Sequence, residues 1–226
     1  MKIIALLACL ILWTCVSSPT QSEPGTWQLV WESPGDGSYR SIHFVDSNHG
    51  WAVGDSGTII HTENGGRSWT QQQSGSSSNL KVVYFINPQV GWVAGGDNTI
   101  LHTKDDGQSW HSRAPAGDSS RIFTDLFFAD EVTGWVVRQL GELLYTEDGG
   151  TTWGVQRSWE QGGSALISFV DDQVGYIMPR ADSMLYKTSN GGQDWIPISS
   201  QHFARAKGLY FTDEQYGWIP TSTAPS

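Results

Sequence analysis

The amino-acid sequence predicts an all-β protein made of repeated sheets, and three observations carry that prediction. The composition combines 12 Trp and 26 Gly with only 16% charged residues, which is typical of large buried rings separated by tight turns. A Gly-Trp pair recurs every 41 to 43 residues, once as Gly-Tyr, and an octapeptide ending in Trp follows four of these pairs. Periods of this length indicate repeat architectures.

The N-terminus has the pattern of an export signal. Lys2 supplies the positive charge, and the eleven residues 3–13 are apolar or small, too short a run to span a bilayer. The segment ending at Cys15 resembles a bacterial lipobox, in which the cysteine is lipidated; ordinary signal cleavage is the alternative. We expect residues 1–22 to be a signal peptide or lipoprotein signal with a short linker, and residues 23–226 to be the folded body.

Charge and cysteine usage exclude several classes of function. The formal net charge of −10 repels a phosphate backbone or an anionic membrane surface, so we expect no nucleic-acid partner and no membrane attachment except through a lipid anchor. Both cysteines, Cys9 and Cys15, precede the body. The body therefore has no thiol for a disulfide, a zinc site or nucleophilic catalysis.

Each repeat starts with a predicted strand that ends in a turn. A Phe stands six residues before each Gly-Trp glycine and an aliphatic residue stands eight before it, a spacing that puts both on one strand face. An Asp or Asn four residues before the glycine can accept backbone N–H bonds and open a turn. These marker glycines are Gly50, Gly91, Gly134, Gly175 and Gly217.

The octapeptides are Asp boxes. An Asp or Asn side chain accepts backbone N–H bonds in the turn, a glycine takes a positive φ, and the Trp returns to the core. The residues predicted to have this structural role are Thr62, Asn64, Gly66 and Trp69; Thr103, Asp105, Gly107 and Trp110; Thr146, Asp148, Gly150 and Trp153; and Thr188, Asn190, Gly192 and Trp195.

Four boxes in register with the Phe-x5-Gly-Trp pattern indicate one four-stranded antiparallel sheet per repeat. About forty residues per four strands is the size of a β-propeller blade. In the first repeat we expect strands near 41–46, 51–54, 58–62 and 68–72. Five repeats begin and four finish, so the predicted fold is a β-propeller of about four complete blades plus a partial fifth.

The export signal, the Phe-x5-Gly-Trp pattern and the box His-Thr-x-Asn-Gly-Gly-x-Ser-Trp together resemble the photosystem II stability/assembly factor family of cyanobacteria and chloroplasts. The resemblance implies a propeller, usually of seven blades, that holds membrane-protein assembly intermediates without catalysis. It also implies an exported chain, in the periplasm, cell envelope or thylakoid lumen, with a protein partner.

Seven blades at this period would need roughly 290 residues beyond the signal. We therefore expect the sequence to be a truncated product, and a natural short propeller that self-associates is the alternative.

Cations recur ten residues before the marker glycines. The first strand of a propeller blade lines the central channel, so we predict a basic collar at one channel mouth, formed by Arg40, Lys81, Arg121 and Lys207. The family that the chain resembles carries a basic patch for partner contact, although the third and fourth repeats have no cation at this slot. Ordinary solvated charges are the alternative. Trp159 is a further candidate contact residue, or else an outer-blade core residue.

No catalytic, cofactor or metal site is predicted. The box carboxylates lie one per blade and cannot converge. His61 and His102 share one slot in neighbouring repeats, but sheets pack about 10 Å apart, whereas zinc needs both nitrogens within about 2 Å. We expect both to be ordinary strand residues.

The alternative function is a sialidase-like or related glycosidase, or a carbohydrate-binding propeller, since such proteins also carry Asp boxes. A sialidase site needs three converging arginines and a Tyr-Glu nucleophile pair. We find no convergent candidates for these groups and expect no enzymatic activity.

Overall fold

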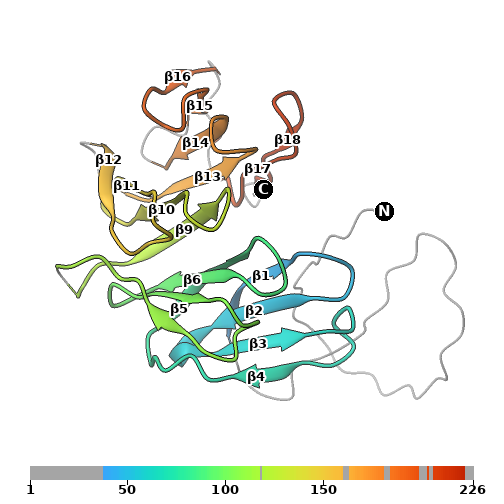
Figure 1. The fold of residues 1–226 in the computed structure, drawn as a ribbon. Coiled ribbons are helices and arrows are strands. Elements are labelled where there is room, and N and C mark those ends of the chain that lie inside the picture. Colours follow the sequence, from blue (N-terminus) through green and yellow to red (C-terminus); the bar gives the residue numbers. More distant parts are fainter. Residues whose placement is uncertain are drawn as a thin grey trace, which may run out of the picture.

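The computed structural model describes residues 38–117, 119–159, 163–180, 184–198, 203 and 206–221. The expected signal segment, with Cys15, lies outside the described residues. Five antiparallel sheets follow one another along the chain and curve around a common centre (Figure 1). Four sheets have four strands in sequence order, and the fifth has two within the described residues. The predicted all-β propeller of four complete blades and a partial fifth is confirmed.

The strands of the blades are as follows. Blade 1 contains β1 (Tyr39–Phe44), β2 (Gly50–Gly54), the 3₁₀ turn η1 (Asp55–Gly57), β3 (Ile59–Thr62) and β4 (Thr70–Gln72). Blade 2 contains β5 (Leu80–Phe85), β6 (Gly91–Gly95), β7 (Ile100–Thr103) and β8 (His111–Ser112). Blade 3 contains β9 (Phe123–Phe128), β10 (Gly134–Arg138), β11 (Glu142–Thr146) and β12 (Gly154–Ser158). Blade 4 contains β13 (Ala165–Phe169), β14 (Gly175–Pro179), β15 (Tyr186–Thr188) and β16 (Ile196–Pro197), and the fifth sheet contains β17 (Tyr210–Phe211) and β18 (Gly217–Trp218).

The strand limits in blade 1 differ from the predicted ranges where side chains accept hydrogen bonds from the backbone. β1 ends at Phe44 rather than 46, because the Asp46 carboxylate accepts the backbone N–H groups of Asn48 and His49 at 2.7 and 2.8 Å. β4 starts at Thr70 rather than 68, since Ser68 still belongs to the box turn. The predicted Asx-type turn is confirmed in every repeat, with equivalent bonds at Asn87, Asp130, Asp171 and Asp213.

Packing explains why the Phe and the marker glycine occur together. Phe44 pairs with Gly50 across β1 and β2, and its ring lies over the glycine. A Cβ on Gly50 would come within 2.5 Å of Phe44 Cε1. The same overlap with the Phe six residues earlier occurs at Gly91, Gly134, Gly175 and Gly217. The glycine is needed for this close approach rather than for an unusual φ.

In the first four repeats, the aromatic ring after the marker glycine stacks on the Phe of the next blade. Trp92 of β6 lies on Phe128 of β9, with ring centroids 3.7 Å apart and planes within 4°. Equivalent stacks join Trp51 to Phe85, Trp135 to Phe169 and Tyr176 to Phe211, at 3.5 to 3.9 Å. The core therefore consists mainly of interfaces between blades, as expected for a repeat architecture.

Side chains also connect the first strands of adjacent blades. Asp125 of β9 accepts the backbone N–H of Ile167 in β13 at 3.0 Å, and Ser168 of β13 accepts that of Phe211 in β17 at 2.9 Å. These first strands pair through their backbones only within their own blade. Such bonds therefore fix how neighbouring blades sit against each other.

Candidate functional site

Each Asp box is a closed set of hydrogen bonds. In the second box, Thr103 Oγ1 donates to Asp105 Oδ1 at 2.7 Å and accepts the Gly107 N–H at 2.9 Å. Asp105 also accepts the Ser109 N–H at 2.9 Å and the Ser109 hydroxyl. These donors lower the pKa of Asp105, because they favour its ionised form. A box carboxylate in this state is occupied by the hydrogen bonds of its own turn and has little freedom to act on a substrate.

The side chain at the box centre acts as acceptor or donor toward the residue four positions on, as Asp148 and Asn190 illustrate. Asp148 accepts a hydroxyl from Thr152 at 2.7 Å. Asn190 instead donates its amide to the Asp194 carboxylate at 2.9 Å, where two carboxylates would repel each other. The four boxes thus use one geometry with two complementary donor and acceptor arrangements.

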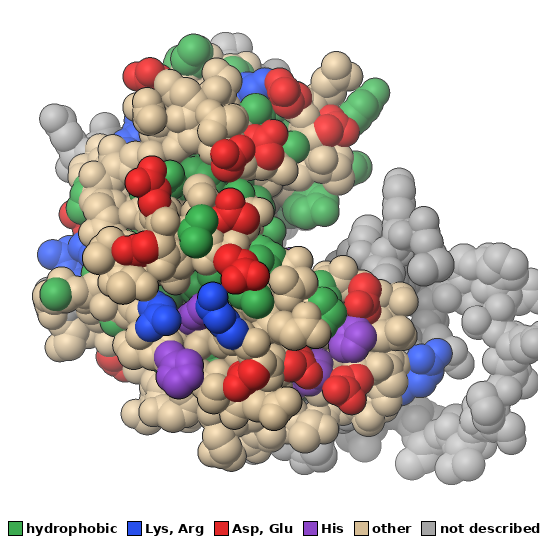
Figure 2. Space-filling model, in the orientation of Figure 1, with side chains coloured by type: hydrophobic (Ala, Val, Ile, Leu, Met, Phe, Trp, Pro, Cys, Tyr) green, Lys and Arg blue, Asp and Glu red, His purple; other side chains and the backbone are tan. Residues whose placement is uncertain are grey.

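The blades have two chemically different ends. At one end, which we call the turn end, the box turn bonds to the Asx turn of its own blade, as in Gly65 N–H to Asn48 O at 2.9 Å. Ion pairs Lys104–Glu131 and Lys187–Glu214 join successive blades there. The opposite end holds the starts of the first strands and the turns between second and third strands, and we call it the collar end. Figure 2 shows one face of the molecule with Asp and Glu over both halves of the arc and His over the blade 1 and blade 2 half.

The predicted collar cations lie at the collar end, and two of them share an acidic neighbour. Arg40 binds Asp55 of η1 through two bonds, Nε–Oδ1 at 2.6 Å and Nη2–Oδ2 at 2.9 Å. The Arg40 guanidinium, helped by the charge of Lys81, lowers the pKa of Asp55. The positive charge of blade 1 at this end is therefore partly neutralised.

Arg121 also lies beside an acid. Its Nη1 is 3.9 Å from Glu142 Oε2, and Arg138 Nη1 is 2.8 Å from the same oxygen. Two arginines around one carboxylate leave a net positive charge at the start of blade 3. Lys207, the collar residue of the last sheet, is held by its backbone N–H to Pro220 O at 2.7 Å and has an exposed side chain.

Trp159 lies away from the first strands. It directly follows β12, where its N–H bonds to Gly141 O at 2.7 Å. Its ring packs against the core cluster between blades 3 and 4, with the Arg157 guanidinium 6.0 Å from the ring centroid. These contacts fit an outer-blade core residue, and a partner contact at Trp159 stays a prediction.

The His61 and His102 rings are core residues, as the strand-residue expectation implied. His61 is 7% exposed and stacks on Trp51, with centroids 4.6 Å apart; His102 is 3% exposed and stacks on Trp92 at 4.8 Å. Burial lowers the pKa of His102 to about 4 and lowers that of His61 as well. Both rings are therefore neutral at pH 7.

Two features of the site region were missed by sequence reasoning. A row of rings, His43, Tyr84 and Phe127, runs across the first strands of blades 1 to 3 at centroid distances of 4.7 and 5.0 Å. These residues stand seven before the marker glycines, so the repeat alignment could have revealed them. Asp106 occupies a position where the other boxes have glycine, and burial raises its pKa to about 6.

The last sheet exposes aromatic residues. Tyr210, Tyr216 and Trp218 are 62%, 64% and 53% exposed. Among the described residues no helix has the length and apolar character needed to cross a membrane.

Comparison with known proteins assigns the chain to a family. The family model described as photosynthesis system II assembly factor YCF48 matches residues 20–117 and 116–206. Photosystem II assembly protein Ycf48 of Thermosynechococcus vestitus is 33% identical over 67 residues, covering 28% of this chain and 19% of that protein. Photosystem II assembly lipoprotein Ycf48 of a Picosynechococcus species is 38% identical over 73 residues, covering 31% and 21%. The matches thus span about a fifth of each curated relative.

Solved structures agree on the fold. YCF48 bound to a D1 peptide superposes with a TM-score of 0.64 at 21% identity, covering 82% of this chain and 62% of that one. YCF48 from Cyanidioschyzon merolae gives 0.62 at 19%, covering 80% and 62%. The GH74 xyloglucanase from Xanthomonas campestris gives 0.65 at 12%, covering 82% and 34%, so the fold alone does not separate binding from catalysis. The family model covers both halves of the repeat array, and the chain therefore belongs to the photosystem II assembly factor YCF48 family.

Proposed function

We propose that the chain is a non-enzymatic, exported, protein-binding propeller that assists the assembly of a membrane-protein complex, photosystem II where the host is photosynthetic. The observation that carries the proposal is the family match over residues 20–117 and 116–206, which includes the four boxes and the collar cations Arg40, Lys81 and Arg121. A related protein of the same fold has been solved with a D1 peptide. The proposed partner here is likewise a segment of a membrane-protein subunit or its precursor.

The collar end is the proposed contact surface. The whole chain has a net charge of −10, whereas Lys81, Arg121 and Lys207 lie at one end of the blades. A local positive field on an acidic protein attracts an acidic partner segment and orients it during encounter. Asp55 and Glu142 reduce this field without cancelling it, because Arg121 and Arg138 share the single carboxylate of Glu142.

Export and anchoring follow from the N-terminus. The Picosynechococcus relative is described as a lipoprotein. We extend this to the chain through Cys15, placed after an apolar run in a lipobox-like segment. Ordinary signal cleavage would release the same body without an anchor.

The absence of catalysis is supported by what the polar groups already do. Three of the seven described arginines, Arg40, Arg121 and Arg138, are already paired with carboxylates. The box acids are occupied by turn donors. We expect no turnover of a fluorogenic sialoside or a xyloglucan oligosaccharide above the buffer rate.

The test measures binding of a D1 peptide to the full chain by surface plasmon resonance at 0.1 and 1 M salt. Lys81→Glu combined with Lys207→Glu should slow association about tenfold at 0.1 M salt and have little effect at 1 M, because the Debye length falls from about 10 Å to about 3 Å. The matched control is Lys104→Glu, a reversal at the turn end, where Lys104 is 62% exposed.

Equal association rates for the collar variant, the control and the wild type would show that the collar does not guide binding. Absence of binding to the D1 peptide and to host envelope proteins in a pull-down would contradict the proposed function itself.

A further inference from the structure

The interface between blades 1 and 2 departs from the repeat at one residue. The other three boxes have Gly65, Gly149 and Gly191 after the central Asp or Asn, with φ between 66° and 70°. Blade 2 has Asp106 there, at φ 62°. Glycine is the least strained residue in this left-handed region. An aspartate at this position therefore has a more strained backbone and adds a carboxylate.

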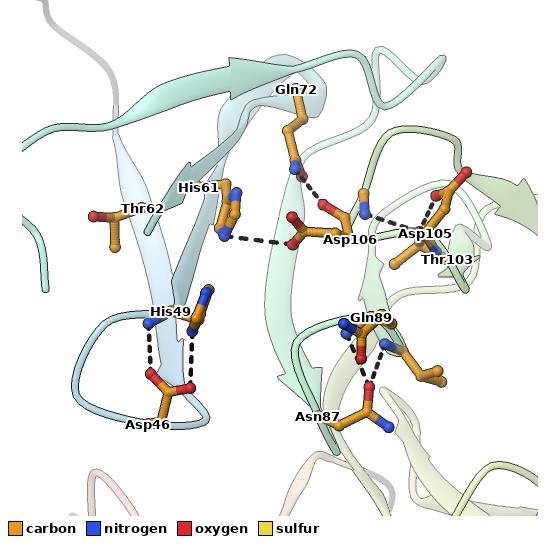
Figure 3. A network of polar contacts seen from close by, with 12 residues as sticks. Asp46, His49, His61, Thr62, Gln72, Asn87, Gln89, Thr103, Asp105 and Asp106 are labelled. Atoms are coloured by element: carbon orange, nitrogen blue, oxygen red, sulfur yellow. Dashed lines mark hydrogen bonds and ion pairs between the residues drawn. The ribbon is translucent and has the colours of Figure 1, made fainter. Parts of the chain in front are cut away.

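The Asp106 backbone is held on both sides, which fixes where its carboxylate points. Its N–H bonds to Gln89 O at 3.0 Å, and its carbonyl accepts Gln72 Nε2 of blade 1 at 2.6 Å. The side chain lies against blade 1, with Oδ1 3.4 Å from His61 Nε2 (Figure 3).

The two facing atoms of His61 and Asp106 are unsatisfied hydrogen-bonding groups. His61 Nε2 and Asp106 Oδ1 are both buried, and neither has a hydrogen-bond partner of good geometry. The stack of His61 on Trp51, with planes within 10°, keeps the nitrogen aimed at Asp106. A buried neutral imidazole facing a carboxylate without an aligned hydrogen bond is costly unless a further group satisfies both.

Glu63 completes a set of three ligands. It follows His61 by two residues, is exposed, and can bring a carboxylate oxygen within 4.8 Å of both other ligand atoms. Zinc bonds to imidazole nitrogen and carboxylate oxygen are about 2.0–2.2 Å long, which puts two ligands of a tetrahedron about 3.3–3.5 Å apart. The 3.4 Å between His61 Nε2 and Asp106 Oδ1 matches that edge.

We propose that His61, Glu63 and Asp106 form a binding site for a divalent transition-metal ion such as Zn²⁺, which joins blade 1 to blade 2 at the turn end. The three protein ligands leave a fourth position open to water. The ion would satisfy the two buried atoms and neutralise the two carboxylates. Gln72 and Gln89, which hold the Asp106 backbone, would orient its ligand.

The next interface serves as an internal control. His102 repeats the ring stack of His61 and also has an unpartnered Nε2. Blade 2 has Lys104 in place of Glu63, and blade 3 has Gly149 in place of Asp106. The same histidine slot thus lacks both carboxylates, and the site should be confined to blades 1 and 2.

The test titrates the EDTA-treated full chain with ZnCl₂ by isothermal calorimetry and records the visible spectrum with Co²⁺. We expect one site per chain, a tetrahedral Co²⁺ spectrum, and a melting temperature that rises with Zn²⁺. Asp106→Gly, which restores the residue of the other boxes, should fold normally and lose at least about tenfold in Zn²⁺ affinity. Glu63→Gln should behave in the same way.

A matched pair of histidine variants separates binding from packing. Blade 3 has Tyr145 in this slot, with its ring 5.3 Å from that of Trp135 and tilted by 40°, so tyrosine is compatible with the fold. His61→Tyr should abolish binding and His102→Tyr should leave it unchanged. Unaltered Zn²⁺ affinity in Asp106→Gly, or no saturable binding by the wild type, would overturn the proposal. Neither outcome bears on the D1 peptide assay, because the collar is at the opposite end.

Discussion

Blade 2 and the last sheet have the same Gly-Trp signature, but its Trp is buried in blade 2 and exposed in the last sheet. Trp92 is fully buried between Phe128 of the next blade and His102 of its own, and its Nε1 donates to Gly149 O at 3.2 Å. Trp218 is 53% exposed, and its ring contact is with Tyr210 of the same sheet, at 6.2 Å.

The difference teaches that a repeat residue is stabilised by the repeat that follows it. The ring after the marker glycine points out of its own sheet and needs the next Phe to cover it. The motif therefore sets the position of the ring, and the neighbouring blade buries it, as in nearest-neighbour descriptions of repeat proteins.

The largest expected effect tests this comparison directly. Trp92→Ala should lower the free energy of unfolding by about 3–5 kcal/mol, the range for large aromatic deletions in cores. Trp218→Ala should change it by less than about 1 kcal/mol, because most of the ring already contacts water. Chemical denaturation followed by circular dichroism gives both values. Similar losses for the two variants would mean that the neighbouring blade does not determine the contribution of the ring.

The second effect concerns the glycine of the signature. Gly134→Ala would place a methyl group inside the Phe128 ring, so we expect a loss of about 1–3 kcal/mol from overpacking. Gly154 in β12 has no atom near an added Cβ, and Gly154→Ala should change stability by no more than about 0.5 kcal/mol. The same denaturation assay compares them. A neutral Gly134→Ala would show that the Phe ring moves aside and that the Phe-x5-Gly spacing has another cause.

Most of the fold could be predicted from the sequence because its signals are local and repeated. The Asx turn depends on residues two and three positions apart, and the box closes within seven residues, from Thr103 to Ser109. Strand ends were less accurate, since Asp46 and Ser68 bind the backbone where a strand would otherwise continue.

The candidate sites were less predictable because they depend on contacts between distant residues. Arg40 was placed at the collar end from its slot, but its partner Asp55 stands fifteen residues away in η1. The metal prediction considered the pair His61 and His102, whereas the structure brings His61 to Asp106 across the blade interface. Only the substitution of one box glycine pointed to that residue.

The smallest expected effect is a pH dependence at the interface of blades 3 and 4. Burial removes water from the Asp125 carboxyl and raises its pKa to about 7, although hydrogen bonds from the N–H groups of Ile167 and Leu126 oppose the shift. A carboxyl whose pKa is higher in the folded protein binds more protons there, so folding is favoured at low pH. This contribution is fully present below about pH 4 and is lost as pH rises to about 7.

Because part of Asp125 reaches solvent, the slope should be smaller than the limit of about 1.4 kcal/mol per pH unit. Asp125→Asn cannot ionise and should flatten the stability profile between about pH 4 and pH 7 relative to the wild type. Asp125→Ser introduces the residue that blade 1 uses at this slot, where Ser41 Oγ accepts the Val83 N–H at 3.4 Å, and should flatten it equally. Denaturation midpoints at half-unit pH steps give the three profiles. Parallel profiles would place the titration elsewhere and show that Asp125 stays ionised, held by its two backbone donors.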